Sequence, residues 1–316
     1  MKPSLGHFAQ VRLLVSLALA ASLVSPAAGG TVTLIPAADT TIMAFAPDNN
    51  AGGRPWISAG SNRFSSPNRA LLRFGIATNV PAGARITAAT LSLSVTGIPI
   101  DGYAVGVFDL HRLLRDWGEG NKNPINSPGQ GLPAGTNEAD WNTPFAYTTN
   151  VWGQPGAAEG SDYAAAVTAS QYFYDTTQSP YPFPGPSDDD NPMIRDIQLW
   201  LDQPGTNFGW ILLCENEGDP LTARRLGSRE DPNFPPQLTI DYLLPPHIDQ
   251  IQHVGNAVSL SFTAQADQTY AVQFRDSLPP GPWQLLTNVG SFSAVTPVSI
   301  TDAIASSRRF YRLMTY

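Results

Sequence analysis

The 316-residue sequence contains a single cysteine, Cys214, which excludes an intramolecular disulfide. Its stability must therefore come from packing, and a chain of this length can bury one large core and a smaller one. Cys214 lies in the apolar stretch "GWILLCENE". This setting predicts a buried small side chain rather than a nucleophile.

Lysine is almost absent as well. Only Lys2 and Lys122 are lysine among 18 cationic residues, against 26 acidic ones, and the net charge is −8. A chain this acidic is a poor candidate for binding nucleic acid, which proteins hold by neutralising phosphates. The preference for arginine has two interpretations: a bias in codon use, or a need for planar donor pairs that hold carboxylates.

Long apolar runs are confined to the N-terminus. Residues 1–30 have the pattern of a cleavable secretory signal, with two cations, an apolar run at 13–24 and small residues suited to cleavage near Ala27 or Gly29. No later run is long enough to span a bilayer. The sequence therefore predicts a secreted or extracytoplasmic protein without a membrane span.

The remaining sequence is dominated by apolar residues at alternate positions, as in "TLSLSVTG" (90–97) and "QLTIDY" (237–242). Glycine and proline separate these segments, so we expect an all-β fold: an antiparallel, jelly-roll-like β-sandwich. Further strands are predicted at 31–35, 39–45, 68–74, 103–111, 171–175, 208–215 and 223–229.

One short helix is predicted to interrupt the strands. Asn191 is a suitable N-cap and Pro192 a suitable first helical residue, and Pro204 with Gly205 would end the helix. Its apolar stripe places Trp200 in the core rather than on a sugar-binding platform. The stripe consists of Met193, Ile197, Trp200 and Leu201.

The organisation predicted for the chain is a signal at 1–30, a large sandwich at 31–244 and a small β-sandwich domain at 245–316. The proline-marked stretch "LLPPH" (243–247) forms the boundary, and four strand patterns follow it. The segment 118–190 is rich in glycine, proline and asparagine, which predicts long surface loops. Its many aromatic residues indicate that part of this segment packs.

The stretch "NRALLRF" (68–74) places Ala70, Leu72 and Phe74 on one face of a strand, and Arg69, Leu71 and Arg73 on the other. The two arginines could hold carboxylates of the protein itself or of an external ligand. Together with nearby residues they form the predicted ligand-binding set, which consists of Arg54, Trp56, Arg63, Arg69 and Arg73. We expect Arg69 to be structural, and a solvent-side cluster of Arg54, Trp56 and Arg63 to contact the ligand.

A second arginine cluster, Arg224, Arg225 and Arg229, lies close in sequence to several acids. Pairing within the protein is the favoured interpretation for Arg225 and Arg229. No cofactor is predicted, but a structural calcium ion is an open alternative, because hard cations take carboxylate oxygens from loops. The weak candidates for its ligands are Asp39, Asp48, Asp188 and Asp189, and a negatively charged helix N-terminus is the other interpretation of the last two.

Six short motifs follow one another in the first domain: "ADTTI" (38–42), "NNAGG" (49–53), "RALLRF" (69–74), "ARITAATLSLSV" (84–95), "LWLDQPGTNFGWIL" (199–212) and "GSREDPNFPPQLTIDY" (227–242). In these motifs and their order the domain resembles the DNRLRE family of secreted bacterial β-sandwich domains. This family is also described as carbohydrate-binding module family 96. The resemblance implies a jelly-roll-like sandwich that binds a polysaccharide such as alginate.

The C-terminal segment resembles a small fibronectin- or immunoglobulin-like module, through "YAVQFRDSLPPGPWQLL" (270–286) and "RRFYRL" (308–313). The resemblance implies a role in spacing or docking, and no site is predicted there.

Short catalytic motifs are missing: there is no G-x-S-x-G elbow, no H-E-x-x-H zinc motif and no phosphate-binding loop. His111 and three carboxylate pairs remain as candidates for acid–base chemistry, namely Asp116 with Glu119, Glu138 with Asp140, and Glu215 with Glu217. We expect a noncatalytic protein that binds polysaccharide, with acidic, uronate-containing polymers among the candidate ligands. The alternative is a structural or adhesion module with a cell-surface or enzyme partner.

Overall fold

The computed structural model describes residues 29–124, 129–183, 192–277, 281–303 and 308–315. Strands dominate these ranges, all pairings between the strands are antiparallel, and the single α-helix is α1 (Pro192–Asp202). The all-β prediction is confirmed. Residues 1–28, which hold most of the predicted signal, lie outside the described ranges. Within those ranges no helix is long and apolar enough to cross a membrane.

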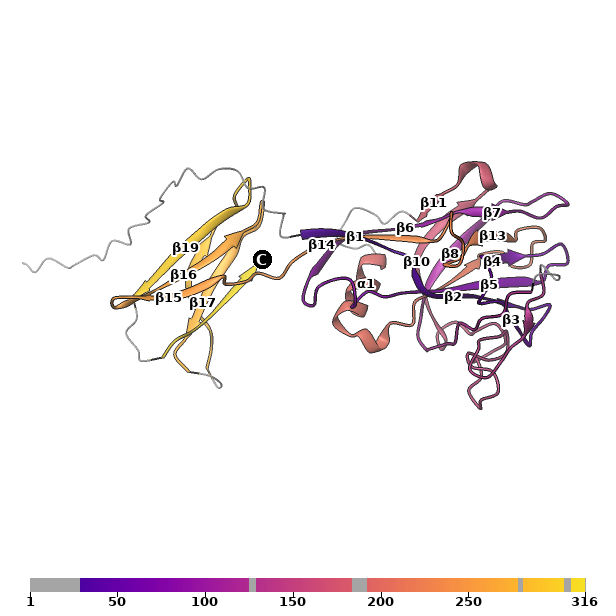
Figure 1. Cartoon of the computed structure of the whole chain (residues 1–316), viewed down its shortest axis with the longest axis horizontal. Coiled ribbons are helices and arrows are strands. Elements are labelled where there is room, and N and C mark those ends of the chain that lie inside the picture. Colours follow the sequence, from indigo (N-terminus) through magenta and orange to yellow (C-terminus); the bar gives the residue numbers. More distant parts are fainter. Residues whose placement is uncertain (1–28, 125–128, 184–191, 278–280, 304–307, 316) are drawn as a thin grey trace, which may run out of the picture.

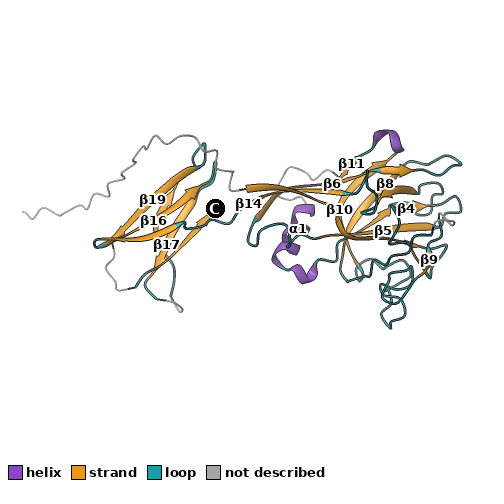
Figure 2. Ribbon diagram, in the orientation of Figure 1, coloured by secondary structure: helices purple, strands orange, loops and turns teal. Residues whose placement is uncertain are grey.

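The first sandwich consists of two sheets (Figures 1 and 2). The four-stranded sheet has the order β1-β14-β6-β11, from β1 (Gly29–Leu34), β14 (Gln237–Leu243), β6 (Arg85–Leu93) and β11 (Tyr181–Phe183). The larger sheet has the order β10-β8-β12-β5-β4-β13-β7, and β2 also pairs with β5. Its strands are β2 (Pro36–Met43), β4 (Trp56–Ser61), β5 (Pro67–Phe74), β7 (Val95–Gly97), β8 (Gly106–Leu113), β10 (Tyr163–Phe173), β12 (Trp210–Cys214) and β13 (Arg224–Gly227).

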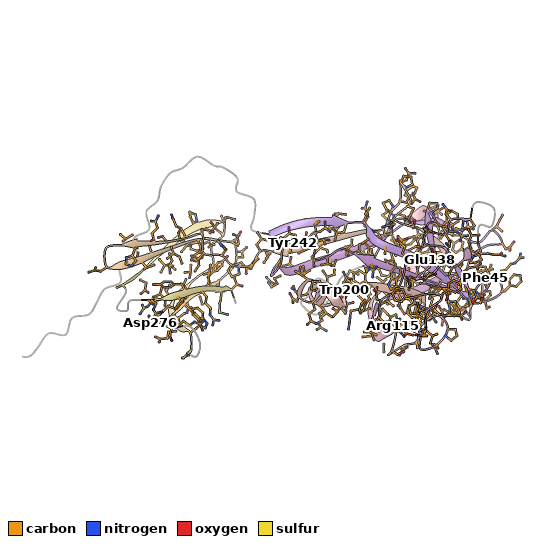
Figure 3. All side chains as sticks on the ribbon, turned by 60° about the horizontal axis from the view of Figure 1, so that its bottom comes forward. Phe45, Arg115, Glu138, Trp200, Tyr242 and Asp276 are labelled. Atoms are coloured by element: carbon orange, nitrogen blue, oxygen red, sulfur yellow. The ribbon has the colours of Figure 1, made fainter. Side chains whose placement is uncertain are left out.

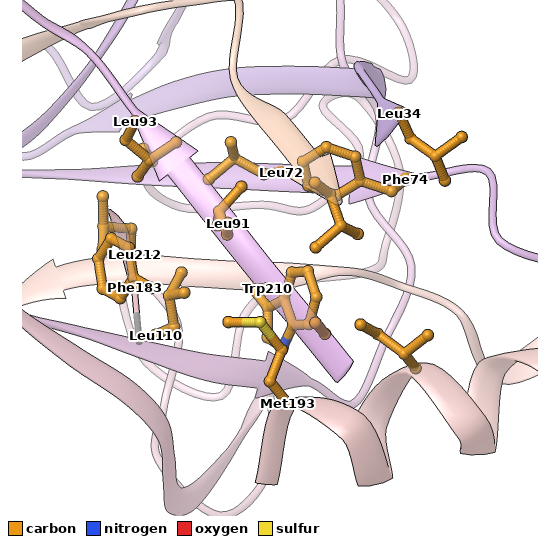
Figure 4. Close-up of a cluster of buried hydrophobic side chains, with 14 of the residues drawn as sticks. Leu34, Leu72, Phe74, Leu91, Leu93, Leu110, Phe183, Met193, Trp210 and Leu212 are labelled. Carbon is orange, nitrogen blue, oxygen red and sulfur yellow. The ribbon is translucent and has the colours of Figure 1, made fainter. Parts of the chain in front are cut away.

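The main core lies between these two sheets, and α1 packs against it. Figure 4 shows Leu72 and Phe74 of β5, Leu91 of β6 and Trp210 of β12 in one cluster with Met193 of the helix. The four residues of the predicted helical stripe are all buried, including Trp200, so that prediction is confirmed. Cys214 is also buried, and burial raises the pKa of its thiol. The predicted N-cap, Asn191, lies outside the described residues.

The segment 118–162 is called the insertion below, and its described residues, 118–124 and 129–162, cover the outer face of the larger sheet. Leu71 of β5 and Ile211 of β12 pack there in a second apolar cluster with residues of the insertion and its flanks: Trp117, Ala139, Trp152, Ala157 and Tyr163. Arg115, which is labelled in Figure 3, forms an ion pair with the buried Asp162 at 2.9 Å. The larger sheet is therefore buried on two faces over these strands.

The predicted loop character holds for most of the insertion, whose one described strand, β9 (Leu132–Pro133), pairs with β3 (Asn49–Asn50). The prediction was wrong at the C-terminal side of the segment, because β10 begins at Tyr163, well before the expected residue 171. Exposed residues along the first half of this edge strand hide its alternation. β4 was not predicted either, since its core residues Ile57 and Ala59 are too few to stand out.

The second sandwich consists of two three-stranded sheets with a small core of their own. Their orders are β15-β16-β19 and β18-β17-β20. The strands are β15 (Gln250–Val254), β16 (Ala257–Ala264), β17 (Tyr270–Arg275), β18 (Gln284–Val289), β19 (Thr296–Ala303) and β20 (Phe310–Thr315). Four of these were predicted. The two that were missed, β15 and β18, are edge strands with largely exposed residues.

Candidate ligand-binding site

Arg69 of β5 is held by the protein's own groups. Its Nε and Nη2 donate to the two carboxylate oxygens of Glu217 at 2.8 and 2.7 Å. Its Nη1 donates to the carbonyls of Gly156 and Ala157 in the insertion, and the guanidinium lies 5.4 Å from the ring centre of Trp141. Arg69 therefore fastens the insertion to the sheet, in agreement with the structural role expected for it.

Arg73 is engaged in a similar way, although it is more exposed. Its Nη1 donates to Asp116 Oδ1 at 2.5 Å, and its guanidinium lies 5.3 Å from the ring centre of Trp117. These contacts pair Arg69 and Arg73 within the protein, which favours the structural interpretation over the ligand-binding one. The insertion covers that face, and Glu217 and Asp116 occupy the positions that an external carboxylate would take.

Arg63 does not join Arg54 and Trp56, which corrects the expected cluster. It follows the C-terminal end of β4, whereas Arg54 and Trp56 lie at its N-terminal end, and six residues of strand span about 16 Å. The exposed Arg63 side chain pairs with Asp101 at 3.3 Å and lies over the ring of Phe64. Arg63 is thus a separate surface group on the turn between β4 and β5.

Arg54 and Trp56 do lie together, and Arg225 of β13 joins them. The guanidinium carbons of Arg54 and Arg225 are 5.3 and 5.0 Å from the ring centre of Trp56. Arg54 is buried, which corrects its expected place on the solvent side, whereas Arg225 is exposed and Trp56 half-buried. We call these three residues the Trp56 face.

Sheet register explains how the Trp56 face forms. Gly227 pairs with Trp56 and Arg225 with Ser58, so side chains of the two strands share the outer surface. The core residues Ile57 and Leu226 point the other way. Burial, and then the neighbouring charge of Arg225, lowers the pKa of Arg54. Sequence reasoning named Arg225 in the second arginine cluster and favoured pairing within the protein for it. Its contact with Trp56 could not be predicted, because a contact between neighbouring strands leaves no mark in local spacing.

The other two arginines of the second cluster serve the fold. Arg224 is buried and donates to backbone carbonyls, among them Tyr174 O at 2.7 Å and Ala104 O at 2.8 Å. Arg229 Nε lies 2.9 Å from Glu119 Oε1 and 2.8 Å from Glu230 Oε1. These contacts agree with the structural interpretation of Arg229.

Asp39, one of the calcium candidates, is 1% exposed beside this network. Its Oδ2 accepts the backbone N–H of Arg229 at 2.7 Å, and its own N–H donates to Glu119 Oε1 at 2.8 Å. Burial, reinforced by the charges of Glu230 and Glu119, raises the pKa of Asp39 to about 8. Asp39 is therefore mostly protonated at neutral pH.

In the described part of the chain, the residues predicted to bind calcium do not come together to form a site. Asp48 is exposed and its Oδ1 accepts from Asn142 at 3.0 Å, whereas Asp39 is buried. Asp188 and Asp189 lie outside the described residues. Among the residues that are described, no three His, Cys, Asp or Glu side chains form a group that could hold a metal ion. The calcium ion remains a prediction.

The candidate acid–base residues make contacts within the fold. Glu138 Oε2 accepts the N–H of Gly135 at 2.6 Å, and Asp140 Oδ1 accepts those of Asn142 and Thr143. His111 Nδ1 lies 2.9 Å from the carbonyl of Ala164. Asp116, Glu119 and Glu217 bind the arginines described above. These contacts of the six residues named here hold turns and strands in place, and the absence of catalysis stays a prediction.

Comparison with protein-family models gave no match, and neither did comparison with curated proteins.

Proposed function

We propose that this is a secreted, noncatalytic β-sandwich protein that binds acidic polysaccharide through the Trp56 face. The observation that carries the proposal is the position of the exposed Arg225 guanidinium, 5.0 Å from the ring centre of the half-buried Trp56. The resemblance of the first domain to a carbohydrate-binding family points the same way. So do the structural contacts of the candidate catalytic groups.

The chemistry of a uronate fits such a pair. An indole offers a flat apolar surface for the carbon-bound face of a sugar ring, and it keeps a polar edge for water or hydroxyl groups. A guanidinium beside the ring can take the uronate carboxylate with two parallel N–H donors, which an ammonium cannot. Arg54 beneath the indole adds a second positive charge to the same face.

Affinity electrophoresis in gels containing polygalacturonate, alginate or neutral dextran tests the proposal. We expect the two polyuronates to slow the mature protein, and added salt to reduce the effect because exposed charges are screened over about 10 Å at 0.1 M. The Arg225→Lys variant keeps the positive charge but loses the two parallel N–H donors of the guanidinium. It should weaken binding about 10-fold, the equivalent of one charge-assisted hydrogen bond.

Arg63→Lys is the matched control, because Arg63 is also an exposed arginine over an aromatic ring. It should bind polyuronate like the wild type. Equal binding by the Arg225→Lys variant and the wild type would contradict the assignment of the Trp56 face. New reducing ends released from a polyuronate would contradict the noncatalytic part of the proposal.

A second candidate function is adhesion to another protein, which exposed apolar loop residues favour. Phe64 on the β4–β5 turn is 75% exposed, and Ile100 on the loop before β8 is fully exposed. The ion pair between Arg63 and Asp101 holds these two loops together. A mature protein that no polysaccharide slows would favour this candidate over polysaccharide binding.

A further inference from the structure

The sheet β18-β17-β20 of the second sandwich has one face on the core and one on the surface. Tyr270 and Val272 of β17 belong to the buried cluster, so strand alternation places Gln273 and Arg275 on the outer face. Arg312 of β20 is the register partner of Gln273 and shares that face. The same surface therefore carries two arginines from neighbouring strands.

Trp283, just before β18, lies against both arginines. The guanidinium carbons of Arg275 and Arg312 are 4.4 and 4.6 Å from its ring centre, and Arg312 Nε donates to Gln273 Oε1 at 2.8 Å. Within the described part of the chain, neither arginine forms an ion pair with a carboxylate. All three side chains of this Trp283 face, Arg275, Trp283 and Arg312, are half-buried.

Arg309, a neighbouring arginine in the second sandwich, has a structural role, because it binds carboxylates of the protein itself. Arg309 lies over Phe274, with its side chain 10% exposed, and binds Asp276 at 2.8 Å and Asp302 at 2.9 Å. Those hydrogen bonds raise its pKa. Arg275 and Arg312 also lie against an aromatic ring, but among the described residues no carboxylate pairs with them. Two positive charges on one indole therefore favour the binding of an anion from outside the protein.

We propose that the Trp283 face is a second binding site for a carboxylated polysaccharide. The indole would carry the sugar ring, and the two guanidiniums would take carboxylates from the chain bidentately. The ligand class rests on the function proposed above. The site itself is separate, because it lies on the other sandwich and uses none of the residues of the Trp56 face.

Two sites on one chain have a measurable consequence. The segment from β14 to β15 spans only residues 244–249, so both sites can engage the same long polymer at high effective concentration. Loss of either site should then reduce the apparent affinity for long polyuronate by about 100-fold. Short oligouronates cannot bridge the two sites. For them, loss of one site should lower the number of oligomers bound per chain and leave the affinity of the remaining site unchanged.

The experiment is calorimetric titration of the full mature chain with an oligogalacturonate, together with binding to immobilised polygalacturonate. The wild type should bind two oligomers. Arg275→Lys/Arg312→Lys and Arg225→Lys should each keep one binding step at wild-type affinity, weaken the other about 10-fold and lower the avidity for the polymer. Arg63→Lys should match the wild type. Thermal melting confirms that each variant is folded, and the two single lysine variants replace the double one if it melts early.

The outcomes separate the two sites. If the double variant binds both oligomers with wild-type affinity and keeps its avidity, the Trp283 face is not a site, whatever Arg225→Lys does. Loss confined to the double variant would retain the Trp283 face and overturn the Trp56 face. A wild type that binds neither oligomer nor polymer would overturn both proposals.

Discussion

At the scale of single residues, Asp39 couples stability to pH. Its pKa is about 8 in the folded chain, against 3.8 for an ordinary aspartate. Between these values the folded state keeps a proton that the unfolded state has lost, so stability falls as pH rises from about 4 to about 8 and then levels off. The slope is at most about 1.4 kcal/mol per pH unit.

Asp39→Asn should remove this slope. An amide cannot ionise, its oxygen can still accept from the Arg229 N–H, and its NH₂ group can donate toward Glu119 or Glu230. In urea unfolding from pH 5 to pH 9, the free energy of unfolding of the variant should rise relative to that of the wild type as pH rises. Asp48→Asn, at an exposed position, should retain the wild-type slope. Parallel curves for the wild type and Asp39→Asn would contradict a buried, protonated Asp39.

Residue orientation could be predicted from the sequence in β5, whereas residue partners could not. Alternation along a strand is local, and it correctly placed Leu72 and Phe74 in the main core and Leu71 on the opposite face. The carboxylate that binds Arg69 is 148 residues away in sequence. Nothing in local spacing selects Glu217 over nearer acids, and the same holds for the meeting of Trp56 with Arg225.

At the scale of elements, the insertion behaves as a packed layer. Trp117, which directly precedes the insertion and packs in the same cluster as its Ala139 and Trp152, is 1% exposed and donates its indole N–H to the carbonyl of Phe208 at 2.8 Å. Trp117→Ala should cost about 3 to 5 kcal/mol in urea unfolding, as much as Phe74→Ala in the main core. Phe64→Ala, at a 75% exposed position, should change stability by less than about 0.5 kcal/mol. A cost for Trp117 as small as that for Phe64 would mean that the insertion is loosely attached.

The elements that the sequence predicted well have strong periodicity. The stripe of α1 recurs with the helical period and is fully buried, and the central strands alternate cleanly. The elements it missed or shortened are edge or short strands: every residue of β15 is exposed, so no buried face marks it. Edge strands satisfy their backbone on one side only, and their side chains are not forced into a pattern.

At the scale of the whole molecule, the two sandwiches have separate cores of unequal size. We expect two transitions in differential scanning calorimetry, with enthalpies of about 150 and about 50 kcal/mol at about 0.7 kcal/mol per residue. Phe262→Ala, in the small core, should lower the midpoint of the smaller transition alone, and Phe74→Ala that of the larger. A single transition that both variants shift would show that the sandwiches unfold as one unit.

The second apolar cluster under the insertion also affects how the chain reaches its fold. The complete apolar surface that the insertion covers exists only once β2, β5 and β12 have assembled, because its partners Ile42, Leu71 and Ile211 come from three strands. Until then these strands present an apolar stripe, and such transient surfaces promote aggregation. A minimal domain made by deleting 118–162 would keep that stripe permanently uncovered. Solubility during folding therefore depends on a segment that contributes little regular secondary structure.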